Sequence, residues 1–187
     1  LKNTMSLNKN KNNKNIYIFD CEPANYPCKI QSWPFINQYQ KILKNTDNLI
    51  NFFSEKDRKN IFYRSLNNGK NLSQKIKKKN PSIKLSDLNR EQFKDIKKNI
   101  KLAICMYPET VIVDLITNGI PTIIYIPKEL YSFDNESKKM IKYLKLNQIY
   151  FDDFEKLKSH LNRIKDSPRE WWMSKSNQLV IKKFKEN

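Results

Sequence analysis

The sequence has almost none of the residues on which the best-known nucleotide and metal motifs depend. It contains only 2 glycines in 187 residues, and neither a G-x-G-x-x-G nor a G-x-x-x-x-G-K-[S/T] stretch occurs. It has 1 histidine and 3 cysteines (Cys21, Cys28 and Cys105), without a C-x-x-C pair. These absences argue against glycine-rich dinucleotide sites, P-loop chemistry, a zinc site and a disulfide framework. We expect reduced cysteines and no bound metal or cofactor.

Long hydrophobic runs are also missing. No apolar stretch approaches the roughly 20 residues that a membrane-spanning helix needs. Residues 1–15 are polar throughout, so they do not resemble a signal peptide, and we expect them to be a disordered basic lead-in. We therefore expect a cytoplasmic protein with one domain over residues 16–187. The first residue is Leu rather than Met, and we expect the sequence to be a piece of a longer protein.

The charge is strongly of one sign, with a formal net charge of +17 and an isoelectric point of about 9.7. Such a surface can attract nucleic acid or acidic lipid. However, the lysines are spread along the whole chain beside many Asn and Ile residues, as an AT-rich genome would encode at exposed positions. We expect no specific nucleic-acid partner, a surface that favours phosphate-bearing ligands, and peripheral contact with the inner face of a membrane as an open alternative.

Short apolar stretches alternate along the chain with amphipathic ones. This alternation predicts a Rossmann-like α/β fold, in which a doubly wound, mostly parallel sheet of about six strands has helices on both faces. Strands are expected near residues 16–23, 60–66, 83–87, 101–107, 121–127 and 148–151. Helices are expected near residues 34–56, 71–79, 92–99, 109–118, 137–145, 154–165 and 169–185.

The stretch YPETVIVDLITNGIPTIIYIP, residues 107–127, is the most informative part of the sequence. It predicts a strand end at Tyr107, a helix, a glycine stop at Gly119 and a second strand. Ligands of such sheets bind beyond the carboxyl ends of the strands, and a helix N-terminus suits phosphate. Thr110 and Asp114 lie one helical turn apart, opposite the apolar residues, and a carboxylate there can accept two ribose hydroxyls. The alternative, a merely solvated stripe of an amphipathic helix, stays open on spacing alone.

This stretch resembles the C-terminal-domain motif of nucleotide-sugar-dependent glycosyltransferases of the GT-B type, in which a hydroxyl residue and an acidic helix precede Gly-x-Pro-x-Ile. More narrowly, the chain is similar to a family of bacterial surface-carbohydrate biosynthesis transferases. The segments YRSLNNG and IKLSD, and the C-terminal end from QIYFDDFEKL to REWWMSKSNQLVIKKF, agree in order and spacing. The resemblance covers roughly residues 16–185.

The resemblance implies a metal-independent glycosyltransferase, of which this chain would be the donor-binding domain. A nucleotide sugar would be the substrate, a glycan or lipid-linked molecule the acceptor, and an N-terminal domain of the same longer chain would hold that acceptor. By position, Thr110 would approach the donor phosphate, Asp114 the ribose and Arg64 the phosphate charge. Tyr107 and Glu109 would lie at the same donor site, and the loop residues Gln31 and Ser32 would border the cleft.

Glu109 departs from the resemblance, because a small hydroxyl-type residue is expected there. A carboxylate near a diphosphate is repulsive, by about 1 kcal/mol or more depending on its exposure. An acidic residue at a helix start is favourable for the helix itself. Glu109 therefore keeps open a non-catalytic Rossmann-like assembly domain, and the net charge keeps open a basic nucleic-acid-binding module.

A few other residues invite a functional interpretation. Asp20 and Glu22 follow the first predicted strand, where acid–base residues can lie, but they can equally cap the loop. His160 is expected to be a surface or half-buried helical residue without a catalytic role. Trp171 and Trp172 could stack on a sugar, although we expect at least one of them to anchor the last helix against the sheet.

Overall fold

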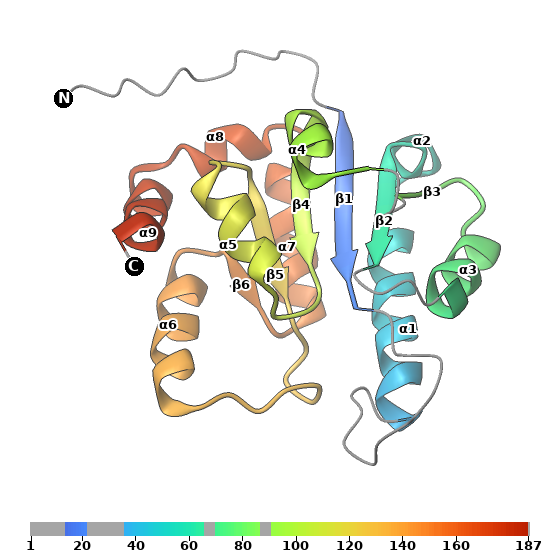
Figure 1. The fold of residues 1–187 in the computed structure, drawn as a ribbon, viewed down its shortest axis with the longest axis horizontal. Coiled ribbons are helices and arrows are strands. Elements are labelled where there is room, and N and C mark those ends of the chain that lie inside the picture. The colour runs from blue at the N-terminus through green and yellow to red at the C-terminus, as the bar shows by residue number, and fades with distance from the viewer. Residues whose placement is uncertain (1–13, 22–35, 66–69, 87–90, 187) are drawn as a thin grey trace.

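The computed structural model describes residues 14–21, 36–65, 70–86 and 91–186, which form one parallel β-sheet flanked by helices (Figure 1). The sheet has six strands in the order β3-β2-β1-β4-β5-β6, and every neighbouring pair is parallel. This confirms the predicted fold class. The strands are β1 (Asn15–Asp20), β2 (Ile61–Ser65), β3 (Lys84–Leu85), β4 (Ile100–Cys105), β5 (Thr122–Tyr125) and β6 (Tyr150–Phe151).

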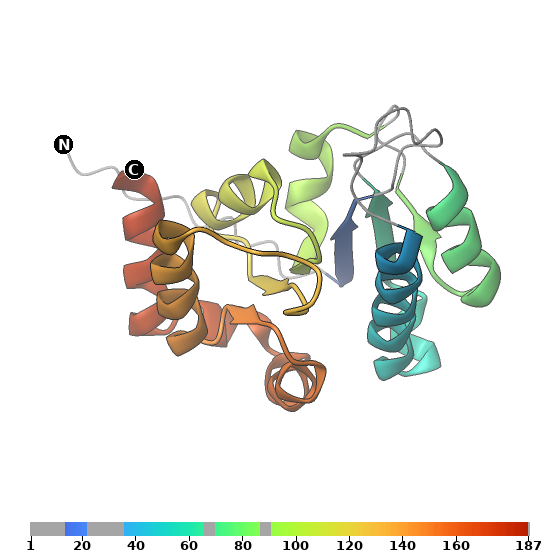
Figure 2. The same ribbon diagram turned by 90° about the horizontal axis from the view of Figure 1, so that it is seen from below.

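Helices lie between the strands and after the last one. They are α1 (Ile36–Phe52), α2 (Glu55–Arg58), α3 (Lys70–Lys79), α4 (Phe93–Ile96) with the 3-10 turn η1 (Lys97–Asn99), α5 (Thr110–Thr117), α6 (Asn135–Leu146), α7 (Phe154–Ile164), α8 (Pro168–Trp172) and α9 (Lys175–Glu186). Figure 2 shows α1 and α7 on one side of the strands and α4 and α5 on the other.

The sheet is buried on both faces, which explains why its strands are almost continuously apolar. Alternate residues of β4 point to opposite sides, so that Leu102 and Ile104 join one cluster while Ala103 and Cys105 join the other. The first cluster packs α1, α3 and α7 against the sheet. The second packs α4, α5, α6, α8 and α9 against the opposite face.

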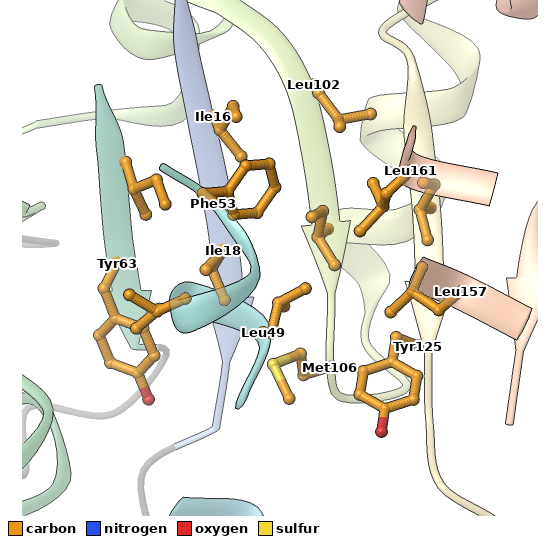
Figure 3. Packing of buried hydrophobic residues seen from close by; sticks show 14 of the residues in the cluster. Ile16, Ile18, Leu49, Phe53, Tyr63, Leu102, Met106, Tyr125, Leu157 and Leu161 are labelled. Carbon is orange, nitrogen blue, oxygen red and sulfur yellow. The ribbon is translucent and has the colours of Figure 1, made fainter. Parts of the chain in front are cut away.

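The first cluster is seen from close by in Figure 3, where Ile16 and Ile18 of β1 lie beside Leu49 and Phe53. Leu49 and Ile18 are completely buried. Truncating a leucine of this kind to alanine costs about 2–5 kcal/mol, because the lost contacts leave a cavity. Tight packing on both faces therefore holds the strand ends, and the residues that follow them, in fixed positions.

Helix α5 ends as its sequence predicts. Gly119 has a φ of 71°. Its amide donates to the Ile116 carbonyl over 2.9 Å, and the Ile120 amide donates to the Leu115 carbonyl over 3.0 Å. These two bonds form a Schellman motif, which needs a left-handed residue at this position. The glycine stop is confirmed, and it turns the chain directly into β5.

The prediction of one C-terminal helix over residues 169–185 is wrong, because these residues form two helices, α8 and α9. Side chains of α9 bind the carbonyl groups that end α8: Asn177 Nδ2 donates to the Trp171 carbonyl over 2.8 Å, and Gln178 Nε2 to the Trp172 carbonyl over 2.9 Å. The helix predicted over residues 34–56 is also too long, because α1 ends at Phe52. Ser54 then caps α2, since its side chain accepts a hydrogen bond from the Asp57 amide.

Candidate functional site

The order of the strands fixes where a ligand is expected. β1 and β4 are neighbours, and the chain leaves them toward opposite edges of the sheet, so the connections after them diverge. In open α/β sheets, ligands bind in the crevice outside the carboxyl ends of such a strand pair. A pocket of about 200 Å³ between Lys14, Asp57 and Lys165 lies at the opposite, amino-terminal edge. The candidate functional site therefore lies at the carboxyl ends of β1 and β4.

The N-terminus of α5 lies at this edge, directly after β4. Glu109 is its N-cap residue, with an extended backbone (φ −139°, ψ 161°), and its side chain makes no capping hydrogen bond. The amide groups in the first turn of a helix have no partner within the helix, and they carry the positive end of its dipole. An anion is therefore favoured in front of Thr110 and Val111.

Thr110 and Asp114 both lie on the exposed side of α5, while Ile112, Leu115 and Ile116 are buried against the sheet. The predicted amphipathic arrangement is confirmed. The hydroxyl of Thr110 and the carboxylate of Asp114 are thus presented to solvent on one stripe of the helix. Tyr107 and Glu109 lie on the connection that leads from β4 into this helix.

Burial changes the acid–base behaviour of two residues beside the helix start. It raises the pKa of Glu109, whose side chain is half-buried. It also raises the pKa of Tyr107, and the nearby Cys21 and Glu109 raise it further. Glu109 therefore loses its charge more easily than a fully solvated glutamate does. This reduces the repulsion that is expected between Glu109 and an anion at the helix start.

Tyr131 was not anticipated by the sequence and lies against this site. Its ring packs edge-on against Tyr107, with a centroid separation of 5.8 Å and an interplanar angle of 62°. Burial raises its pKa, and Tyr107, Cys21 and Asp20 raise it further. The ring contact places Tyr131 at the carboxyl edge of the sheet, beside the residue that follows β4 by two positions. It follows β5 in the sequence, and no local pattern marks it as a site residue.

Asp20, at the end of β1, is buried and 1% exposed. Its Oδ2 accepts hydrogen bonds from Thr46 Oγ1 of α1 over 3.0 Å and from the Tyr63 hydroxyl of β2 over 3.1 Å. Its Oδ1 accepts one from the Cys21 amide over 2.8 Å. Of the two interpretations of Asp20, the structure supports a carboxylate that fixes the chain where β1 ends. Glu22, Gln31 and Ser32 lie outside the described residues.

Arg64, at the end of β2, is also buried, at 4% exposed. Its guanidinium donates to Ser86 Oγ and to the Glu91 carbonyl, both over 2.8 Å, and lies 4.0 Å from Glu91 Oε2. The structure therefore holds Arg64 on the β2–β3 side of the sheet, tied to the segment that follows β3. Its charge is partly offset there by Glu91.

His160 was expected at or near the surface, but it is 1% exposed, because α7 turns it between the rings of Phe151 and Trp171, at 5.1 and 5.0 Å. That prediction was wrong. Trp172 is 1% exposed and packs in the second cluster with Val180 of α9, so the prediction that at least one of the two tryptophans anchors the last helix is confirmed.

The described residues contain no group of three or more His, Cys, Asp or Glu side chains placed to hold a metal ion. Among the helices the structure describes, none is long and apolar enough to cross a membrane.

Comparison with known proteins identifies a family for this chain. Neither the curated proteins nor the solved structures contain a match to this chain. The family model described as LIC12162 family transferase matches residues 1–187, which is the whole sequence. A transferase family agrees with a Rossmann-like sheet that presents a helix start at its carboxyl edge. The chain belongs to the LIC12162 family of transferases.

Proposed function

We propose that this chain is the donor-binding domain of a glycosyltransferase and that it binds a nucleotide-activated sugar in front of α5. The observation that carries the proposal is the exposed stripe of Thr110 and Asp114 on a helix whose N-terminus opens at the carboxyl end of β4. An uncapped helix start supplies amide donors for phosphate. An acidic residue one turn further along can accept the two ribose hydroxyls.

Each residue has a distinct part in this proposal. The α5 amides and the Thr110 hydroxyl bind the donor phosphate, and Asp114 binds the ribose. Tyr107 forms the wall beside the helix start. The positive end of the helix dipole stabilises the negative charge of the leaving nucleotide, so the transfer needs no metal ion. The positive charge of Arg64 would help to offset the phosphate charge of the donor. Gln31 and Ser32 would border the cleft.

The proposal extends to the partners of the domain. A second, N-terminal domain of a longer chain would hold a glycan or lipid-linked acceptor, as in GT-B enzymes, and the reaction would build a surface polysaccharide. The work would take place in the cytoplasm or at the inner face of the membrane. A net charge of +17 supports anionic substrates and contact with an anionic bilayer.

The proposal is tested by titrating the protein with UDP, GDP, CDP, CMP and dTDP while its amide signals are followed by NMR. We expect saturable binding of one nucleotide, with shifts at Thr110 and its neighbours. Asp114→Ala should weaken this binding by about tenfold or more, because it removes charged hydrogen bonds.

Asp95→Ala is the matched control, because Asp95 is an exposed acidic residue on a helix at the amino-terminal edge of β4. It should leave the affinity unchanged. Absence of binding by every nucleotide, from a folded sample, would contradict the proposal for the isolated domain and favour an assembly role. If Asp95→Ala and Asp114→Ala weaken nucleotide binding equally, the change in net charge alone explains the effect.

A further inference from the structure

A second pocket lies at the carboxyl edge, beyond the site in front of α5. It has a volume of about 510 Å³ and opens between α6, β6 and the connection that follows β5. In Figure 1 these elements lie together at the outer edge of the sheet. The pocket is lined by lysines and aromatic rings: Lys128, Lys138, Lys142, Lys145, Tyr131, Phe133 and Tyr150, together with Ser132, Ile141 and Asp152.

Three of the lysines form one stripe on α6. Lys138, Lys142 and Lys145 follow one another at intervals of four and three residues, so they lie on the same face of the helix. Lys128 lines the same pocket from the connection after β5. Four lysines around one concave surface concentrate positive potential there.

Asp152 offsets only part of this charge. Its Oδ2 lies 2.6 Å from the ammonium of Lys145 and 3.9 Å from that of Lys128. Within the described part of the chain, neither Lys138 nor Lys142 forms an ion pair with a carboxylate. Four lysines and one aspartate give the lining a formal charge of +3. Asp152 thus holds Lys145, interacts only at long range with Lys128, and leaves Lys138 and Lys142 available to an anion.

The rings give the pocket an apolar wall of defined position. Tyr131 and Phe133 lie 6.0 Å apart between ring centroids. Tyr150 is buried, its hydroxyl donates to the Ile126 carbonyl over 3.4 Å, and the Lys145 ammonium lies 5.4 Å from its ring centre. Rings beside cations suit a ligand that has an anionic group and an apolar or ring-shaped part.

Lysine is abundant throughout this chain, so the charge alone would be weak evidence. In this pocket, however, the lysines share a cavity with three aromatic residues. The start of α6 does not compete for the anion, because the Asp134 side chain caps it by accepting a bond from the Ser137 amide over 2.8 Å. The attraction therefore comes from the side chains that line the pocket.

We propose that this pocket binds the phosphate group of a phosphate ester, with Lys138 and Lys142 holding the phosphate and the organic part packing on Tyr131 and Phe133. Ammonium groups suit phosphate oxygens as hydrogen-bond donors of opposite charge. A soluble sugar phosphate and the phosphate of a lipid offer the same chemistry. Tyr131 borders both this pocket and the site in front of α5, but Lys138 and Lys142 take no part in the proposed nucleotide site.

The test is an NMR titration with inorganic pyrophosphate and with glucose 1-phosphate, with neutral glucose as the blank. We expect saturable shifts at the amides of Ile141 and its neighbours. The double variant K138Q/K142Q should lose affinity by about tenfold or more. The control K94Q/K98Q removes two exposed lysines at the same spacing of four residues, next to the amino-terminal edge of β4, and should keep the affinity within about twofold.

Sedimentation with vesicles separates the two sources of phosphate. One set contains phosphatidylcholine alone, and the other contains equal parts of phosphatidylcholine and phosphatidylglycerol. Binding of soluble glucose 1-phosphate that K138Q/K142Q weakens supports a soluble ester. Binding confined to the anionic vesicles and weakened by the same variant supports a lipid phosphate.

The remaining outcomes overturn the proposal. One is an equal loss of affinity in K138Q/K142Q and K94Q/K98Q. Another is a set of NMR shifts confined to α5. The third is that a folded sample binds none of the probes. Phe133→Ala should weaken glucose 1-phosphate more than pyrophosphate, because only the former has an organic part to pack on the ring. Asp114→Ala should leave binding in this pocket unchanged, which separates a failure here from a failure of the proposed nucleotide site.

Discussion

At the end of β1, the carboxylate of Asp20 joins three parts of the chain that are distant in sequence. Thr46 and Tyr63, its hydroxyl donors, lie 26 and 43 residues away. Buried polar groups are costly unless they are paired, so removing the shared acceptor affects every donor at once. Asp20 therefore stabilises the strand end from which the candidate site begins.

We expect Asp20→Ala to lower the free energy of unfolding by about 2–4 kcal/mol, because the Thr46 and Tyr63 hydroxyls and the Cys21 amide lose their acceptor. Urea-induced unfolding measures the change. Thr46→Val and Tyr63→Phe remove one donor each and should cost about 1–2 kcal/mol. A smaller loss for Asp20→Ala than for Thr46→Val would show that the carboxylate is not the centre of this network.

His160 gives the protein a pH-dependent stability. Burial, and secondarily the Arg163 charge, lower the pKa of His160 to about 4 from its ordinary value of 6.5. The unfolded chain therefore binds more protons than the folded one between these values, so stability falls as the pH drops from 6.5 toward 4. The slope from this residue is at most about 1.4 kcal/mol per pH unit.

His160→Phe should remove this contribution, because phenylalanine keeps the ring between Phe151 and Trp171 but binds no proton. The measurement is urea unfolding of both proteins across the acidic range. The stability of the variant relative to the original should rise as the pH falls. A constant difference would mean that His160 can be protonated in the folded state at its ordinary pKa.

At the scale of the element, the two helices that lead into β5 and β6 end in the same way but with different residues. The Gln148 amide donates to the Lys145 carbonyl over 3.0 Å, and the Ile149 amide to the Leu144 carbonyl over 2.9 Å. This is the same motif as at Gly119, yet Gln148 adopts a φ of 57° with a side chain. A left-handed backbone is unfavourable for such a residue.

Gln148→Gly should raise the free energy of unfolding by about 0.5–1 kcal/mol, since the relief of backbone strain outweighs the greater freedom of the unfolded chain. Thermal unfolding measures the change. Gln148→Ala is the control: it loses the contact of the Gln148 side chain with Arg163 Nη2 but keeps the strain, so it should not stabilise. Equal stabilisation by both variants would contradict the strain argument.

The elements that could be predicted from the sequence are those with a strong local signal. Strand β4 is apolar except for Lys101, and α5 combines an amphipathic pattern with a glycine stop, so both appear close to where they are expected. The break between α8 and α9 could not be predicted, because Asn177 and Gln178 act there through side-chain bonds to carbonyls six residues back. The spacing of apolar residues does not predict such hydrogen bonds.

The candidate site also contains features that could be predicted from the sequence and features that could not. The exposure of Thr110 and Asp114 follows from helical spacing within one element, and it could be predicted. Tyr131 joins the site from the connection after β5, and its neighbour Tyr107 follows β4. Contacts of this kind depend on the three-dimensional arrangement of several elements, which no local pattern specifies.

At the scale of the whole molecule, the dominant feature is the net charge of +17. Mutual repulsion among like charges destabilises a compact state, and salt screens it. We expect sodium chloride at about 0.15 M to raise the stability by about 1 kcal/mol over a low-salt buffer. Thermal unfolding with sucrose as an uncharged control measures this. The K94Q/K98Q variant should depend less on salt, and a Tm that falls with salt would contradict the expectation.

The sheet described above ends on both sides in a very short strand. β3 and β6 each contain 2 residues, and Lys84 of β3 is exposed. Self-association through sheet edges needs a long row of unpaired backbone groups, which another chain can extend. Neither edge strand of this sheet offers such a row. The fold is therefore protected against fibrous assembly by the brevity of its outermost strands, independently of what the carboxyl edge binds.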